Sequence, residues 1–162
     1  MQSFSSEELL EFIDQSPTCF HVVHTLKNIL DTQGFEQLQE SGEWVLKNGG
    51  KYYVTRNQSS IIAFCVPDTF DGFHIMASHS DSPGFKIKEI PELVSEKKYT
   101  RLNVEGYGGM LMSTWFDRPL SVAGRILVRE GSEIRTRLIK IDRDLLMIPS
   151  LAIHMNRGVN EG

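Results

Sequence analysis

The sequence predicts a mixed α/β fold, in which two helices come first and a β-rich segment follows. Residues 5–15 read SSEELLEFIDQ, where serine precedes acidic residues and apolar residues then form one helical face. A second helix is predicted from Thr18 to Gln33, with Gly34 at its C-terminal cap. Residues 44–66 then hold two segments rich in β-branched and aromatic residues, separated by the turn signals NGG and RNQSS, which is typical of antiparallel hairpins. This order of elements predicts a mixed α/β domain.

The remaining chain reads as strands. A short apolar run at residues 73–76 predicts a core strand that stops in a polar loop. From Phe85 onward, short strand candidates alternate with turn signals and no convincing helix intervenes. We therefore place a domain boundary near residue 90, which divides the chain into residues 1–90 and a β-rich part, residues 91–162. The chain ends in NRGVNEG without a closing helix, which is an indication of truncation.

Composition excludes several classes of protein. The length of 162 residues permits one self-sufficient domain, and 40% hydrophobic with 23% charged residues is ordinary for a soluble chain. No apolar run approaches the roughly 20 residues of a membrane span, and the N-terminus lacks a secretory pattern, so we expect a cytoplasmic protein with no membrane partner. A net charge of -4 without a basic stripe argues against nucleic-acid binding. Cys19 and Cys65 form no CxxC pair and are expected to be small buried apolar residues.

The stretch HIMASHSDSP, residues 74–83, carries the strongest candidate site and allows three interpretations. In the first, His79 binds a metal such as zinc and Asp81 orients it, because residues two apart in an extended segment share one face. One histidine does not make a site, however, since zinc usually needs at least three protein ligands.

In the second interpretation, one of the serines Ser78, Ser80 and Ser82 is a nucleophile with a histidine base. The stretch lacks a G-x-S-x-G elbow, and neighbouring residues of a strand point to opposite faces. In the third interpretation the stretch is only the polar end of a strand, where Asp81 makes turn hydrogen bonds before Pro83. The pattern alone favours this third interpretation.

The other histidines favour packing roles. His21 and His24 lie three apart on a predicted helix, so they could share a metal, but no carboxylate motif accompanies them. His74 begins the predicted strand and reads as a surface or core histidine. His154 follows an apolar run and, on pattern alone, is expected in the core.

Two further motifs read as structural. GYGG at residues 106–109 lacks the lysine of a phosphate-binding loop, so a tight turn or a close backbone approach is expected. STWFDRPL combines the aromatic residues Trp115 and Phe116 with Asp117 and Arg118, which predicts an aromatic anchor with an ion pair at a domain or subunit contact rather than a catalytic role.

Four separated stretches, together with SPTCFHVV near the N-terminus, carry a resemblance to a known family. They are GGKYYVTRNQSSIIAF, ASHSDSPGFKIK, YGGMLMSTWFDRPLSVAGRI and IPSLAIHMNRGVNEG. In this order, along nearly the whole chain, they resemble the M18 family of metallo-aminopeptidases, the aspartyl aminopeptidase group. With this resemblance, metal binding becomes the leading interpretation of His79.

The resemblance implies a zinc-dependent exopeptidase that removes N-terminal, usually acidic, residues from peptides. It implies a three-layer α/β catalytic domain, of which residues 1–90 form the N-terminal portion, and an inserted β-rich dimerisation domain that begins in residues 91–162. His79 matches the family's metal-ligand histidine, Asp81 matches the active-site aspartate that orients it, and His154 matches a histidine that contacts substrate in a neighbouring subunit. Two Zn²⁺ ions in each full-length site, with Co²⁺ or Mn²⁺ as alternatives, and homo-oligomers up to dodecamers are also implied.

The chain departs from the family pattern chiefly by what it lacks. The bridging aspartate, the adjacent glutamate pair, a further carboxylate and the last histidine all correspond to positions after residue 162. Met110, Met112 and Pro119 replace residues common in the family, and these departures concern the subgroup and the substrate preference. We therefore expect an N-terminal fragment that is inactive alone. The alternatives are a noncatalytic module that self-associates through the β-rich segment, and a binding domain for a peptide or small ligand.

Overall fold

The computed structural model describes residues 5–160, and the chain forms two compact units. Unit 1 comprises residues 1–81 and 123–140, and unit 2 comprises residues 82–122 and 141–162. Within residues 5–160, no helix is both long enough and apolar enough to span a bilayer.

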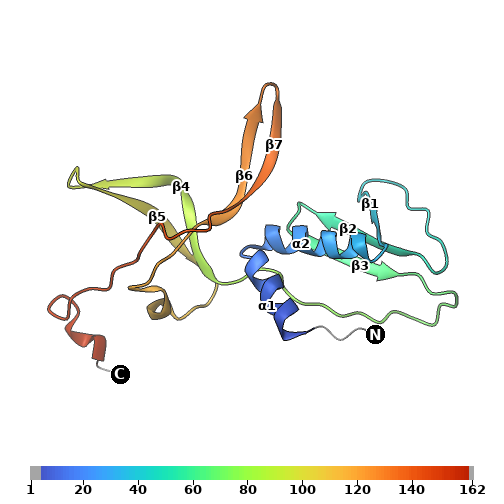
Figure 1. Cartoon of the computed structure of the whole chain (residues 1–162), viewed down its shortest axis with the longest axis horizontal. Coiled ribbons are helices and arrows are strands. Elements are labelled where there is room, and N and C mark those ends of the chain that lie inside the picture. Colours follow the sequence, from blue (N-terminus) through green and yellow to red (C-terminus); the bar gives the residue numbers. More distant parts are fainter. Residues whose placement is uncertain (1–4, 161–162) are drawn as a thin grey trace. The chain divides into compact units, whose positions relative to one another are not determined.

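Unit 1 opens with the two helices that the sequence predicts (Figure 1). Helix α1, Ser6–Gln15, begins with a capping box: the Ser5 hydroxyl accepts from the Glu8 backbone N–H at 3.1 Å, and the Glu8 carboxylate accepts from the Ser5 N–H at 2.7 Å. Helix α2, Cys19–Thr32, begins at the capping residue Thr18. It ends before Gly34, which adopts a left-handed backbone with φ of +77°. Both predicted helices are confirmed.

A three-stranded sheet follows in unit 1. It contains β1 (Glu36–Leu38), β2 (Lys51–Arg56) and β3 (Ser60–Cys65), with β1 parallel and β3 antiparallel to β2. The predicted hairpin around RNQSS is thus confirmed, but residues 44–48 form no strand. These residues form a loop instead. In it, the Trp44 indole donates to the Gln39 carbonyl at 2.8 Å and the Lys47 N–H donates to the Tyr52 hydroxyl at 3.0 Å.

The buried residues of unit 1 come from two of its elements, α2 and β2. Five described residues are buried, and all of them belong to these two elements: His21, Val23, Thr25, Tyr52 and Tyr53. The Tyr53 side chain is the largest fully buried one, and its hydroxyl donates to the Asp31 carboxylate at 2.7 Å. Burial, followed by the bond to Asp31, raises the pKa of Tyr53 to about 12.

Two sequence-based expectations for unit 1 are wrong. Residues 66–81 form no strand, and Phe73, Ile75 and Met76 in the predicted core strand are 84%, 82% and 100% exposed. An extended apolar run becomes a strand only beside a hydrogen-bonded neighbour, and no strand of residues 5–160 pairs with it. Cys65 is exposed rather than buried, because it ends β3 opposite Lys51, where no described element covers it; Cys19 is half-buried.

The hairpin of β6 (Ala123–Glu130) and β7 (Glu133–Lys140) completes unit 1. The Arg125 guanidinium lies 4.0 Å from the Phe20 ring centre and donates to the Asn57 carbonyl at 2.7 Å. The Lys140 ammonium donates to the Asp14 carboxylate at 2.7 Å. These two cationic side chains connect the hairpin to the helices and to the β2–β3 turn.

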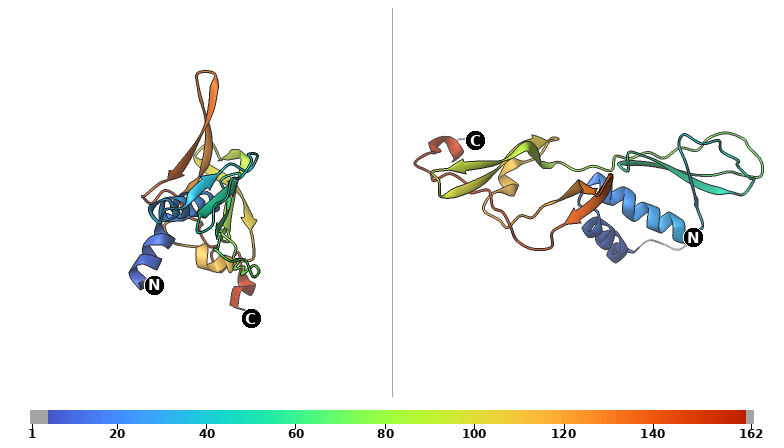
Figure 2. Two further views of the ribbon diagram at one scale, coloured as in Figure 1. Left: turned by 90° about the vertical axis from the view of Figure 1, so that its right-hand side faces the viewer. Right: turned by 90° about the horizontal axis from the view of Figure 1, so that it is seen from above.

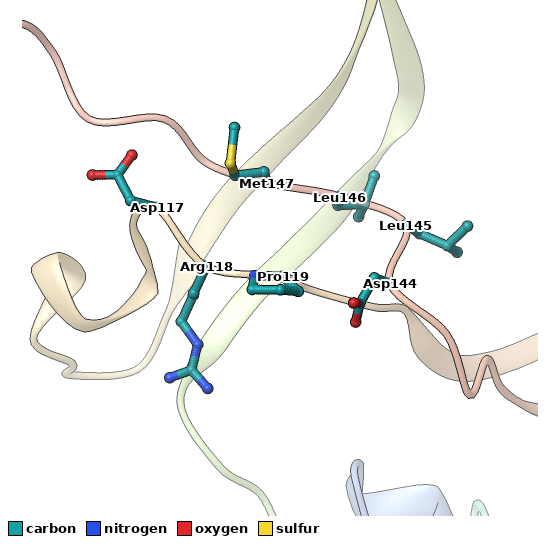
Figure 3. Close-up of a pocket in the computed structure, with 7 residues that line it drawn as sticks. All are labelled: Asp117, Arg118, Pro119, Asp144, Leu145, Leu146 and Met147. Atoms are coloured by element: carbon teal, nitrogen blue, oxygen red, sulfur yellow. The ribbon is translucent and has the colours of Figure 1, made fainter.

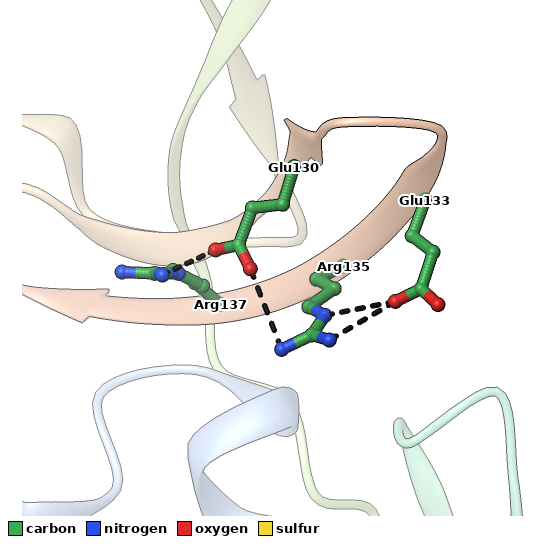
Figure 4. Close-up of polar contacts among 4 residues, drawn as sticks. All are labelled: Glu130, Glu133, Arg135 and Arg137. Carbon is green, nitrogen blue, oxygen red and sulfur yellow. Dashed lines mark hydrogen bonds and ion pairs between the residues drawn. The ribbon is translucent and has the colours of Figure 1, made fainter.

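An ionic cluster lies near the tip of the same hairpin (Figure 4). Arg135 donates to Glu133 at 3.0 Å and lies 3.4 Å from the Glu130 carboxylate, which also accepts from Arg137. All four side chains are solvent-exposed or partly so, and such pairs contribute at most about 1 kcal/mol each to stability.

Unit 2 contains a longer hairpin, seen from two sides in Figure 2. Its strands are β4 (Gly84–Ser95) and β5 (Tyr99–Tyr107), and their register shifts between Ile87 and Glu92, where the chain carries Pro91. The β-rich character predicted after residue 85 is therefore confirmed. The boundary near residue 90 would fall inside β4, and the division into catalytic and dimerisation domains stays a prediction.

Unit 2 continues through the short 3-10 helix η1 (Met112–Trp115) and ends with η2 (Arg157–Asn160). The segment after η1 runs beside residues 145–150: Leu120 donates to the Leu146 carbonyl at 2.9 Å, and Phe116 forms a parallel bridge with Ile148. The predicted turn at GYGG is present, since Gly108 has φ of +74°. A side chain at Gly108 would contact Pro83 at 3.4 Å.

Candidate metal-binding site

His79 and Asp81 form the contact that their spacing predicts. The Nδ1 atom of His79 lies 2.8 Å from the backbone carbonyl oxygen of Asp81 and 3.2 Å from its carboxylate Oδ1. The His79 side chain is 82% exposed and that of Asp81 is 44% exposed. The chain between them is extended enough to place both on one side, so a purely local arrangement orients the ring.

This contact determines which nitrogen of His79 is open to a ligand. Both atoms near Nδ1 are acceptors, so the Nδ1 atom must carry the proton that it donates. In a neutral imidazole the Nε2 atom then keeps its lone pair, and the exposed ring can offer it to a metal. A carboxylate or carbonyl at the other nitrogen is the usual partner of a zinc-bound histidine.

The described residues do not form a complete metal site around His79. Within residues 5–160, no group of three or more histidine, cysteine, aspartate and glutamate side chains could hold a metal. Zinc is normally held by at least three protein ligands. The donor chemistry of His79 fits zinc, and the other ligands would have to come from elsewhere.

The histidines of α2 have structural partners. His21 is buried, and its Nδ1 atom lies 2.8 Å from the Thr18 hydroxyl. Burial is the main cause that lowers the pKa of His21, and the nearby His24 and Lys140 lower it further. His24 lies 3.4 Å from the Asn28 amide. These contacts fit the packing interpretation better than a shared metal.

The Ser80 hydroxyl does not pair with His79 as a nucleophile with its base in this structure. The Ser80 hydroxyl donates to the Ser59 carbonyl at 3.3 Å, which connects the stretch to the β2–β3 turn. The hydrogen-bonding contacts of His79 described here go to Asp81.

His154 belongs to unit 2 and is exposed rather than in the core, contrary to the expectation from pattern alone. It lies in a turn in which Met155 donates to the Ala152 carbonyl at 2.8 Å and Asn156 donates to the Ile153 carbonyl at 3.2 Å. The turn ends the apolar run before it can pack as a strand. Its imidazole is therefore exposed to solvent.

The predicted ion pair between Asp117 and Arg118 does not form. The Asp117 carboxylate accepts from both the backbone N–H of Ser150, at 2.9 Å, and the Ser150 hydroxyl. These two bonds lower the pKa of Asp117. Arg118 donates instead to the Thr114 carbonyl at 3.4 Å. Sequence reasoning missed Ser150, because nothing in the IPS turn indicates a partner 33 positions earlier.

The aromatic part of the same motif does pack. The Trp115 ring meets the Phe85 ring edge-on, with 5.5 Å between ring centres. Beside it, residues 117–119 and 144–147 line a depression of about 370 Å³ (Figure 3). The Asp117 and Arg118 side chains point to different sides of this segment in Figure 3. The depression contains none of the three candidate site residues.

Comparison with known proteins agrees with the sequence motifs. The family model described as aminopeptidase I zinc metalloprotease (M18) matches residues 12–162. A probable M18 family aminopeptidase 2 of Clostridium acetobutylicum is 51% identical over 162 residues, which cover 97% of this chain and 37% of that relative. An aspartyl aminopeptidase of Dictyostelium discoideum is 43% identical, over 96% of this chain and 33% of its own length.

Solved structures share the fold as well. A chain in the cryo-EM structure of the Ape4 and Nbr1 complex matches with a TM-score of 0.89 and 40% identity, over 96% of this chain and 30% of that one. The structure of the S. cerevisiae mApe1 dodecamer matches with a TM-score of 0.84 and 32% identity, over 91% and 36% of the two chains.

These matches place the chain among the metallopeptidases. Its motifs, its fold and the match over residues 12–162 are those of one group within that class, and the chain belongs to the aminopeptidase I (M18) zinc metalloprotease family. It spans about a third of the length of the curated relatives that it matches.

Proposed function

We propose that this chain provides the first metal ligand of a zinc aminopeptidase that removes N-terminal residues, preferentially acidic ones, from peptides. The observation that carries the proposal is the orientation of His79, whose Nδ1 atom is held by Asp81 while its ring is 82% exposed. Membership of a zinc metalloprotease family supports zinc as the metal. Two Zn²⁺ ions in the complete site, with Co²⁺ or Mn²⁺ as substitutes, belong to the same proposal.

Each candidate residue has one role in this proposal. His79 binds zinc through Nε2, Asp81 keeps the His79 ring in the required orientation, and His154 contacts the substrate bound to a neighbouring subunit. Zinc bound at such a site polarises a carbonyl group and lowers the pKa of a bound water. Residues 1–90 then belong to the catalytic domain and residues 91–162 to the dimerisation domain of a cytoplasmic enzyme.

Self-association is the part of the proposal that the exposed apolar surface supports. Leu127 and Ile134 on the β6–β7 hairpin are 69% and 62% exposed, so they form an apolar surface that a second copy of the chain could cover. One structural relative forms a dodecamer. The alternative function, a noncatalytic module that only self-associates, would use the same surface.

The proposal is tested by comparing the chain with a chimera, in which residues 1–162 replace the matching part of the Clostridium acetobutylicum relative. We expect the chimera to release N-terminal Asp or Glu from peptides and to lose this activity in a chelator. The 162-residue chain alone should release none, because one zinc ligand does not assemble a site. Activity is measured as free amino acid released, and assembly of both samples as mass by light scattering.

Two outcomes would contradict the proposal. An inactive chimera that still folds and assembles would favour the noncatalytic module. Chelator-sensitive activity of the 162-residue chain alone would show that its own residues complete a site, contrary to what the described side chains allow.

Asp81 provides a second prediction. Replacing Asp81 by alanine in the chimera should lower zinc affinity about 10- to 100-fold, the usual effect of removing the partner of a metal-bound histidine. The effect should lie at the lower end, because the backbone carbonyl of Asp81, at 2.8 Å, still accepts from the Nδ1–H of His79. Zinc affinity is measured by competition with a chromogenic chelator. Unchanged affinity would remove Asp81 from the site.

A further inference from the structure

The segment that presents His154 is held mainly at one end. Up to Ile148 it pairs with the segment after η1, residues 116–120, where the Asp117 N–H donates to the Ile148 carbonyl at 2.9 Å. From Leu151 to Asn156, the backbone hydrogen bonds found in the described part are local turns, such as Met155 to Ala152. The last side-chain contact before the turn is the one that Ser150 makes with Asp117.

Asp117 holds Ser150 with both carboxylate oxygens. Its Oδ1 accepts from the Ser150 N–H at 2.9 Å, and its Oδ2 accepts from the Ser150 hydroxyl. A carboxylate that accepts two bonds from one residue fixes that residue in direction as well as in distance. We call this pair of bonds the Asp117–Ser150 clamp.

The backbone at Asp117 is adapted to this contact. Its φ is +53°, in the left-handed region that residues with a side chain adopt at a cost. Such a conformation persists only where the surrounding structure fixes it. Here the Asp117 N–H to Ile148 and the two bonds to Ser150 fix it from both sides of the residue.

The clamp limits where His154 can lie, because only three residues separate Ser150 from His154. Four residue steps span at most about 14 Å when fully extended, so a free segment would let the imidazole cover a wide volume. An imidazole that must contact a substrate contributes less to the reaction rate when it is displaced by about 1 Å. Fixing Ser150 reduces this freedom to that of one short turn.

We propose that Asp117 is a positioning residue for His154: by clamping Ser150, it fixes the segment that presents His154 to the peptide substrate. The proposal rests on the substrate role proposed above for His154. Asp117 itself touches neither metal nor substrate and acts through Ser150.

The clamp is tested first in the 162-residue chain, by amide hydrogen exchange of Ser150 followed by NMR. Asp117→Gly removes the carboxylate but accepts the left-handed backbone without strain, so it separates the bonds from the conformation. We expect Ser150 exchange to become about 5- to 10-fold faster, as for the loss of one charge-assisted bond near solvent. Asp117→Asn keeps an acceptor for the Ser150 N–H and tolerates positive φ. In this variant the exchange rate of the Ser150 amide should therefore stay within about 3-fold of the rate in the parent chain.

Asp144→Asn is the matched control, since Asp144 is an exposed aspartate of the same depression and leaves the clamp intact. The amides of β4 and β5 should exchange at the parent rate in all three variants. A Ser150 amide that is unprotected in the parent chain, or equally protected after Asp117→Gly, would overturn the proposal.

The action through His154 is tested by a double-mutant cycle in the active chimera. Asp117→Gly should lower kcat/KM about 10-fold or more, and Asp117→Asn should restore most of it. In a His154→Ala background, Asp117→Gly should have no further effect, because the residue that it positions is gone. Additive losses would mean that Asp117 acts independently of His154 and would overturn the proposal. If the chimera has no activity, the proposed function fails, while the exchange rates still decide whether the clamp exists.

Discussion

Replacing His79 by alanine in the chimera is expected to lower kcat/KM by about 10³-fold or more and to reduce the zinc bound per chain. The metal contributes several kcal/mol to stabilising the transition state, and each 1.36 kcal/mol corresponds to about a tenfold change in rate. The contact of the His79 Nδ1 atom with Asp81 leaves its Nε2 atom available to zinc. Kinetics with an acidic N-terminal peptide and elemental analysis of the purified chimera measure the two effects.

His74 offers a matched control for this experiment. It lies five positions earlier in the same exposed segment, and His74→Ala removes an imidazole of the same size. We expect unchanged zinc content and nearly unchanged kcat/KM for this variant. If both variants lose zinc equally, the segment as a whole, rather than the His79 ligand, is responsible, and the metal role of His79 is wrong.

The parts of the fold that the sequence predicts well depend on neighbouring residues. The Ser5 and Glu8 capping box and the cap at Thr18 each join residues three positions apart, so the sequence shows both partners together. The apolar run at residues 73–76 shows the opposite case. Whether such a run becomes a strand depends on a partner strand, and no strand of residues 5–160 provides one. The periodicity of apolar residues indicates whether a segment tends to form a strand or a helix, but it does not indicate which segments will lie beside it.

The same distinction applies to the candidate site. His79 and Asp81 are two positions apart, so their contact follows from an extended backbone. Asp117 is adjacent to Arg118, which made an ion pair the natural prediction, yet the backbone at Asp117 turns its carboxylate toward Ser150 instead. That choice depends on the pairing of residues 116–120 with 145–148, which no local pattern encodes.

Replacing Tyr53 by alanine in the 162-residue chain is expected to destabilise unit 1 by about 3 to 5 kcal/mol, as for other large buried side chains. The effect should be a large part of the total stability, because Tyr53 is one of only five buried residues among those described and has the largest fully buried side chain. The total free energy of unfolding of a native protein is only about 5 to 15 kcal/mol. Urea denaturation followed by circular dichroism measures the loss, and Tyr99→Ala, at a tyrosine that is 67% exposed in β5, is the matched control.

The Tyr53→Phe variant separates packing from the hydroxyl contact. It keeps the ring and loses the bond to Asp31, so we expect a cost of about 1 kcal/mol, because Asp31 is exposed and water can replace its partner. The pKa of Tyr53 is raised to about 12 in the folded chain, above the ordinary value of about 10. The folded state therefore binds the proton of the Tyr53 hydroxyl more tightly than the unfolded state does. The resulting contribution to the free energy of unfolding is complete below pH 10 and is lost between about pH 10 and 12. Tyr53→Phe should remove this alkaline loss, and a parent chain whose stability stays level from pH 10 to 12 would show that the buried hydroxyl is not held as the structure has it.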